Sequence, residues 1–212
     1  MSSPLMKLIE SLSNPKCTTK DQTIALPNVL DLLKKPTNPL DPNILPPLLS
    51  LLPTCLDTNN SNIKSTTLSC LTALTTIFLP HHNLPLQPTL GPHFPAIATA
   101  LSHHAFGDSK LPLRTLSLTT ALTLLPSTTL QQYYTLLVLN NLRNTQNWRA
   151  RSTALQLFAT SLDNFPGDKS PVASKLGKSI LEKSVDLCSD ANQVRERTEG
   201  TGGARRDQEE RA

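Results

Sequence analysis

The chain has 212 residues, of which 38% are hydrophobic, and its mean hydropathy is −0.20. No apolar stretch approaches the roughly 18–20 residues that a membrane span needs, and the N-terminus lacks the apolar block of a signal peptide. We therefore expect the protein in the cytosol or nucleus. Aromatic residues make up only 4% of the chain, which argues against a core built from β-sheets.

Leucine-rich segments with helical i, i+3, i+4 spacing alternate with polar turns along the chain. The first pair of segments is the weakest, with a turn expected at 14–20. The apolar positions of its two helices are Leu5, Leu8, Ile9 and Leu12, then Ile24, Val29, Leu32 and Leu33. This pattern predicts a helical hairpin.

Three further pairs follow with turns at 58–64, at 107–114 and at 144–151. Their apolar positions are Leu45, Leu48, Leu49, Leu52, Leu56, Leu71, Leu74 and Phe78 in the second hairpin; Ile97, Ala100, Leu101, Leu118, Ala121, Leu122 and Leu125 in the third; and Tyr134, Leu137, Val138, Ala154, Leu155, Phe158 and Leu162 in the fourth. The 18 prolines cluster between the periodic segments, where we expect them to end one helix and start the next.

A fifth hairpin begins with Leu181, Val185 and Cys188, but its second helix is missing from the pattern. Val194 is the last large apolar residue, and residues 196–212 have the composition of a disordered charged tail. We expect either a truncated or altered end, which would leave Leu181 and Val185 without a partner and lower the stability, or a natural solvated tail.

Three basic turns recur in this pattern and close on an arginine. They read GDSKLPLR, NTQNWRAR and SDANQVR, and their closing residues Arg114, Arg151 and Arg195 lie 37 and 44 residues apart. This spacing is close to the roughly 40–47 residue period of HEAT and armadillo repeats. The sequence therefore predicts an all-α fold, a right-handed stack of HEAT-like hairpins over residues 1–195, in which turns of one kind line one edge.

The order of these turns resembles the first TOG-type domain of the CLIP-associating proteins (CLASPs). That family has a Gly-Asp-x-Lys turn closed by Arg, a Lys-Asn-aromatic-Arg-x-Arg turn and a Gly-Asp-x-Asn-x-x-Val-Arg turn, in that order. The resemblance covers roughly residues 6–195 and is clearest after Phe94. The fifth turn departs from the family pattern because it is one residue shorter and has Ser189 in place of glycine.

The resemblance implies a paddle-shaped α-solenoid that binds tubulin through its turns, stabilises dynamic microtubules and is needed for the mitotic spindle. It implies a location in the cytoplasm, on the cytoskeleton and on the spindle, and other spindle or plus-end proteins as partners. Up to Arg195 the chain has 16 lysines and arginines against 11 acidic residues, and tubulin's surface is acidic. The expected tubulin-binding residues are Lys16, Lys20, Lys64, Lys110, Arg143, Asn147, Trp148 and Arg149.

Several turn residues also have a structural interpretation. We expect Arg114, Arg151 and Arg195 to start second helices and to pair with the aspartate of a neighbouring turn, so these three and Asp108 and Asp190 are candidates for either structure or binding. Trp148 is the only tryptophan and is either an interface anchor or a plug between adjacent repeats.

No catalytic, metal or cofactor pattern was found. The histidines at 81–82, 93 and 103–104 lack metal-ligand spacing, and the four cysteines contain no Cys-x-x-Cys pair, which favours reduced thiols. The phosphate loop, the nucleophile elbow and the His-Glu-x-x-His helix are absent. We therefore expect neither an enzyme nor a small-molecule substrate. A generic scaffold with a basic ridge for another acidic partner is the alternative, although aromatics are too few and scattered to favour nucleic acid.

Overall fold

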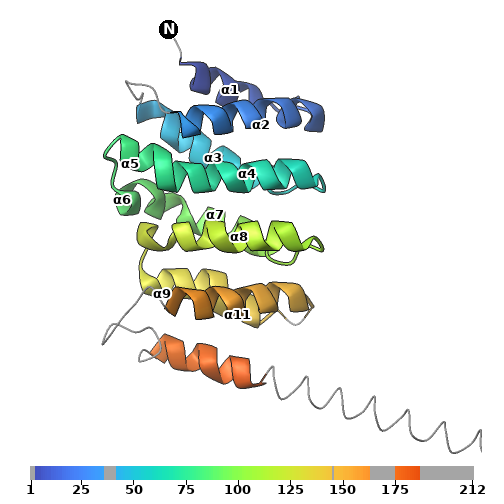
Figure 1. Cartoon of the computed structure of the whole chain (residues 1–212), viewed down its shortest axis with the longest axis vertical. Coiled ribbons are helices and arrows are strands. Elements are labelled where there is room, and N and C mark those ends of the chain that lie inside the picture. The colour runs from blue at the N-terminus through green and yellow to red at the C-terminus, as the bar shows by residue number, and fades with distance from the viewer. Residues whose placement is uncertain (1–2, 36–41, 145, 163–174, 187–212) are drawn as a thin grey trace, which may run out of the picture.

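The helices pair into hairpins that stack along one long axis (Figure 1). The computed structural model describes residues 3–35, 42–144, 146–162 and 175–186, and every regular element within these ranges is helical. The elements are α1 (Pro4–Leu12), α2 (Thr19–Lys34), η1 (Pro42–Ile44), α3 (Leu45–Cys55), α4 (Ser61–Ala73), η2 (Leu74–Phe78), α5 (Leu79–His81), α6 (Leu86–Leu90), η3 (Gly91–His93), α7 (Phe94–His104), α8 (Leu111–Thr123), η4 (Leu125–Ser127), α9 (Leu130–Tyr133), η5 (Tyr134–Leu139), α10 (Asn140–Leu142), α11 (Trp148–Leu162) and a helix over 175–186.

The hairpins form two layers of helices. α1, α3, α7 and the continuous α9–η5–α10 helix make the first layer, and α2, α4, α8 and α11 make the second. Within each layer a helix contacts the next one, as α2 contacts α4 and α4 contacts α8. The expectation of an all-α fold is confirmed for the described residues, and the arrangement is consistent with an α-solenoid.

The core lies between the two layers and is made mainly of leucine. Leu26, Leu48, Leu52, Leu68 and Leu101 are all fully buried, as helical spacing requires of an inward face. Aromatic rings pack in the core of the fourth hairpin. The ring centroid of Tyr133 lies 6.0 Å from that of Phe94 and 5.4 Å from that of Tyr134.

Polar residues on the buried face of α8 were not expected from the sequence. The apolar pattern placed Leu118 and Leu122 inside, but both are only partly buried, whereas Ser117 and Thr120 are fully buried. Thr120 Oγ1 lies 3.0 Å from the hydroxyl of Thr72. The side of α8 that faces α4 therefore consists partly of hydroxyl side chains. The spacing of the leucines alone predicts the wrong inward face for this helix.

A second contact between threonine hydroxyls lies about one helical turn further along. Thr75 Oγ1 lies 2.9 Å from Thr123 Oγ1, and Thr75 also donates to the carbonyl of Thr72 at 2.9 Å. Because each hydroxyl has a partner, burying this row does not leave polar atoms unsatisfied. Two threonine pairs thus join the second hairpin to the third.

The expectation that proline only separates helices is wrong at two sites. Pro27 lies inside α2 and Pro53 lies inside α3. The expected role holds for Pro4, Pro46 and Pro112, which occupy the first or second position of their helices, where the missing N–H costs no hydrogen bond.

The N-terminal hairpin and the last helix also differ in detail from the sequence pattern. Ile24 was expected inside but is 60% exposed, and Ala25 and Leu26 take its place in the core. Leu181 and Val185 are exposed, at 42% and 64%, while Ile180 of the same helix is buried. Cys188, the fifth turn and the tail lie outside the described residues. Within the described ranges, no helix is both long and apolar enough to cross a bilayer.

Candidate functional site on the turn edge

Four turns that join first-layer to second-layer helices lie along the same edge of the stack (Figure 1). They span residues 13–18, 56–60, 105–110 and, with one position outside the described residues, 143–147. We call these turns, with the first helical turn that follows each, the turn edge. Its composition decides what the edge can contact.

The first turn is held by local hydrogen bonds. Asn14 Oδ1 accepts from the Lys16 N–H at 2.9 Å, and Thr18 and Asp21 exchange hydrogen bonds as a capping box at the start of α2. The Thr18 hydroxyl and N–H hold the pKa of the Asp21 carboxyl below its ordinary value. Lys16 is exposed in the turn, but Lys20 lies in helix α2 and not in the turn as expected.

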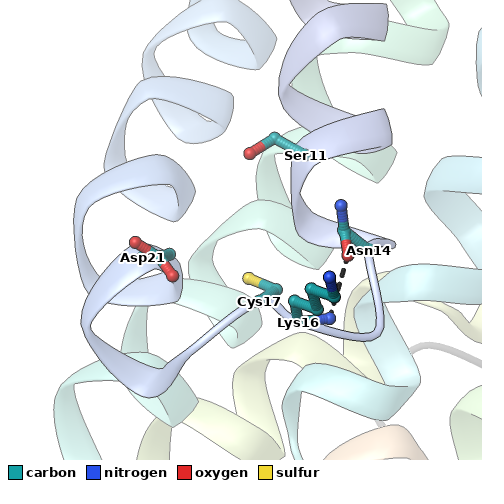
Figure 2. Close-up of a pocket in the computed structure, with 5 residues that line it drawn as sticks. All are labelled: Ser11, Asn14, Lys16, Cys17 and Asp21. Carbon is teal, nitrogen blue, oxygen red and sulfur yellow. Dashed lines mark hydrogen bonds between the residues drawn. The ribbon is translucent and has the colours of Figure 1, made fainter.

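A small open pocket lies beside this turn, as Figure 2 shows. Burial, together with the nearby Asp21 charge, raises the pKa of the Cys17 thiol, so the sulfur stays protonated at neutral pH. A protonated thiol is a poor nucleophile. The residues that line it are Ser11, Asn14, Lys16, Cys17 and Asp21.

Lys64 lies in helix α4, because the second turn ends at Asn60. This corrects the expectation of a turn at 58–64. Lys64 Nζ reaches across to the third hairpin, where it donates to the His104 carbonyl at 2.7 Å and to Asp108 Oδ2 at 3.0 Å. The side chains of Lys64 and Asp108 are each only 13% exposed. Both therefore join neighbouring hairpins and offer little free surface to a partner.

The arginines that close the turns bind backbone carbonyls of their own turns. Arg114 Nη1 donates to the carbonyls of Asp108 at 2.7 Å and Ser109 at 3.1 Å, and Arg151 Nη1 donates to the Asn144 carbonyl at 2.7 Å. The expectation that Arg114 pairs with an aspartate side chain of a neighbouring turn is thus wrong. The cation that takes the Asp108 carboxylate is Lys64.

These cations occupy the same place in three successive helices. Lys64, Arg114 and Arg151 each lie four residues after the residue that precedes their helix, which is Asn60, Lys110 or Asn147. Arg114 and Arg151 fold back over their own turns, whereas Lys64 reaches the neighbouring one, and each donates to a backbone carbonyl. The repeated position indicates a structural role for all three.

Lys110 is an exposed cation of the third turn. Its Nζ donates to the Ser61 hydroxyl at 2.7 Å, and its N–H donates to Asp108 Oδ1 at 2.9 Å. A hydrogen bond to a neutral hydroxyl does not neutralise the ammonium, and the Asp108 carboxylate that lies nearby is already paired with Lys64. Lys110 therefore presents positive charge to the solvent at the junction of the second and third hairpins.

Asn147 starts α11 and also contacts the third turn. Its Oδ1 accepts from the N–H groups of Arg149 and Ala150, both at 3.1 Å. A Cβ placed on Gly107 would lie 1.9 Å from Asn147 Nδ2, so the glycine leaves the space that this side chain fills. Asn147, expected as a contact residue, thus caps a helix and packs against the neighbouring turn.

Trp148 is exposed at the end of the fourth turn, and the half-buried Arg149 packs against it. Trp148 is 59% exposed, and the Arg149 guanidinium carbon lies 5.0 Å from its ring centroid. The indole therefore does not plug the gap between repeats but stands at the surface beneath a cation. Arg143, at the start of this turn, is also exposed.

Leu111 is an exposed residue of the turn edge that the sequence analysis did not single out. It is the first residue of α8, and its side chain is 64% exposed. Its position two residues before buried Leu113 places it out of phase with the helix's inward face. Because the inward face of α8 is partly Ser and Thr, this phase becomes clear only once that face is known.

Two expected turn residues, Asp190 and Arg195, lie outside the described residues. Among the residues that are described, no group of three or more histidine, cysteine or carboxylate side chains could hold a metal ion. Comparison of the chain with protein-family models, with curated proteins and with solved structures returned no match. The turn edge is therefore interpreted from its own residues.

Proposed function

We propose that this chain is a HEAT-repeat module that binds tubulin through its turn edge and stabilises dynamic microtubules, as the resemblance to the first TOG-type domain of the CLASP family implies. Support comes from one observation above all. The exposed Trp148, with Arg149 over its ring, shares one edge with the exposed cation Lys110 of the preceding turn. An aromatic anchor beside cations suits a partner with an acidic surface.

The framework beneath these residues also favours a binding surface. The Lys64–Asp108 pair links the second and third hairpins, and Asn147 over Gly107 links the third and fourth. Three consecutive turns are thus held against one another before any partner arrives. Preorganisation of this kind lowers the conformational entropy that binding must overcome.

Not every residue of the expected set contributes equally to this proposal. Lys110, Trp148, Arg149 and Arg143 are the proposed contact residues, and Lys16 and Lys20 are exposed beside the first turn. Lys64 and Asn147 take a supporting role, because their polar atoms bind within the chain. The proposal therefore centres on the third and fourth turns.

The test is co-sedimentation of the full chain with taxol-stabilised microtubules, with free tubulin examined by gel filtration. The triple variant Lys110→Ala/Trp148→Ala/Arg149→Ala should remain folded and lose binding. A matched control is Lys34→Ala/Lys35→Ala, which removes two exposed cations at the opposite end of α2. The control should bind as the wild type does.

Three results would overturn this proposal. A folded wild-type chain that binds neither free tubulin nor microtubules would leave only a scaffold function. Duplex or single-stranded nucleic acid that displaces tubulin at equal concentration would show that the ridge recognises negative charge in general. Equal losses in the triple variant and in the control would place the binding surface elsewhere.

A further inference from the structure

Two large apolar side chains stand exposed on the turn edge, in consecutive second-layer helices. Leu111 is 64% exposed at the first position of α8, and Trp148 is 59% exposed at the first position of α11. α8 contacts α11, and both helices begin at the same edge of the stack (Figure 1). Because Leu111 and Trp148 are the first residues of these helices, both lie on that edge. We call them the apolar pair.

The apolar pair is specific to the third and fourth hairpins. The same first position in α2 and α4 is occupied by Thr19 and Ser61, which are polar. If the repeat required an apolar residue at this position, all four helices would have one, but α2 and α4 do not. Neither side chain is needed in the core, because the buried residues Leu113 and Ala150 fill the inward positions nearby.

The surroundings of the apolar pair are cationic. Lys110 precedes Leu111, Arg149 follows Trp148, and Arg143 lies at the start of the fourth turn. The segments 105–114 and 143–151 contain a single carboxylate, Asp108, which Lys64 neutralises at 3.0 Å. A second copy of the same surface would carry the same positive charge and be repelled, so self-association through the pair is disfavoured. The charge is complementary to an acidic surface.

We propose that Leu111 and Trp148 form the apolar centre of the tubulin contact, with Lys110, Arg143 and Arg149 as its charged rim. This inference rests on the proposed function and names a specificity residue, Leu111, for the same site. The occupant is an apolar patch on tubulin bordered by acidic side chains. Apolar centres ringed by polar contacts carry most of the energy of protein interfaces, whereas rim charges mainly set the association rate and the salt dependence.

The experiment measures the dissociation constant for tubulin over about 50 to 300 mM KCl. Leu111→Ala and Trp148→Ala should each weaken binding by at least about five-fold, with the slope of log Kd against log salt unchanged. Lys110→Ala should reduce that slope. Ile24→Ala is the matched control, because Ile24 is also a largely exposed aliphatic residue, 60% exposed on α2, away from the third and fourth turns.

The outcomes separate this inference from the proposed function. A wild-type chain that does not bind tubulin overturns both. Binding that depends on Lys110 and Arg149 but is unchanged by Leu111→Ala overturns the apolar pair alone. A dimer of the free chain that Leu111→Ala dissolves would assign the pair to a second copy, and it too would overturn the inference. Thermal melts of each variant check that the fold is intact.

Discussion

Lys64 and Asp108 join two consecutive hairpins through an ion pair of 3.0 Å, although 44 residues separate them in the chain. Lys64 also donates to the His104 carbonyl, so one ammonium group serves a carboxylate and a helix end. The pair sets the position of the third turn relative to α4, and through that turn the position of Lys110. Its energetic weight can be measured directly.

We expect Lys64→Met and Asp108→Asn each to lower the free energy of unfolding by about 1–3 kcal/mol, because each leaves a largely buried charge without its counter-charge. The double variant should lose less than the sum, since neither partner is then left alone. Urea denaturation of the four proteins completes this double-mutant cycle. Additive losses would show that the two side chains do not interact in solution.

The acid stability of the protein should depend on Asp108. Burial opposes ionisation of this carboxyl, but the Lys110 N–H and the Lys64 ammonium outweigh burial and hold its pKa below the ordinary value. A group with a lowered folded-state pKa stabilises the fold above its unfolded pKa of about 3.9, and this contribution is lost as the pH falls through the folded pKa.

The free energy of unfolding should therefore stay level from about pH 7 to about pH 5 and fall below about pH 4. The stability difference between wild type and Asp108→Asn should shrink over the same acid range. Asp21→Asn provides a comparison, because the hydrogen bonds from Thr18 lower the pKa of Asp21 at an exposed site. A constant difference between wild type and Asp108→Asn down to about pH 2 would contradict the assignment.

Gly107→Ala should destabilise the chain through a residue of the next hairpin. The new Cβ would lie 1.9 Å from Asn147 Nδ2, and the amide cannot move without releasing the two N–H groups that it caps. Loss of an N-cap costs about 1 kcal/mol. In the double variant Gly107→Ala/Asn147→Ala the clash is absent, so its loss should be close to that of Asn147→Ala alone, as thermal denaturation would reveal.

Cysteine labelling should report on the N-terminal half of the stack. Burial raises the pKa of Cys55 to about 11 and that of Cys70 to about 12, whereas Cys17 lies partly exposed at the first turn. In a chain carrying Cys188→Ser, the partly exposed Cys17 should react slowly with Ellman's reagent under native conditions, because its pKa is raised, and the two buried thiols should react only on unfolding. Rapid native reaction at Cys70 would mean that α2 and α4 separate.

The sequence predicted the helical hairpins well, because their inward faces are leucine-rich and their turns are polar. The capping residues of α2 and α4, Thr18 and Asn60, follow the ordinary preference for helix starts. What could not be predicted were the partners of the turn cations. Lys64 binds a residue 44 positions away, and such pairing depends on how hairpins stack, which local spacing does not reveal.

Only some of the proposed contact residues on the turn edge could be predicted from the sequence. Trp148 and Arg149 stood out by residue type, but Leu111 is one of many leucines and is recognisable only once the inward face of α8 is known. That face is partly Ser and Thr, so a search for apolar periodicity assigned it to the wrong side. The tubulin assignment itself depends on the family resemblance and stays a prediction.

The threonine pairs form a polar seam between the second and third hairpins. Thr72 with Thr120, and Thr75 with Thr123, meet through hydroxyls that can donate or accept and can rotate to new partners. Interlocked leucines must separate before two helices slide, but hydroxyls can exchange hydrogen bonds as they move. The seam lies toward the C-terminal ends of α4 and α8, away from the turns that the Lys64–Asp108 pair holds together. We therefore expect the stack to bend first along the edge opposite the turns, while the turn edge keeps its shape.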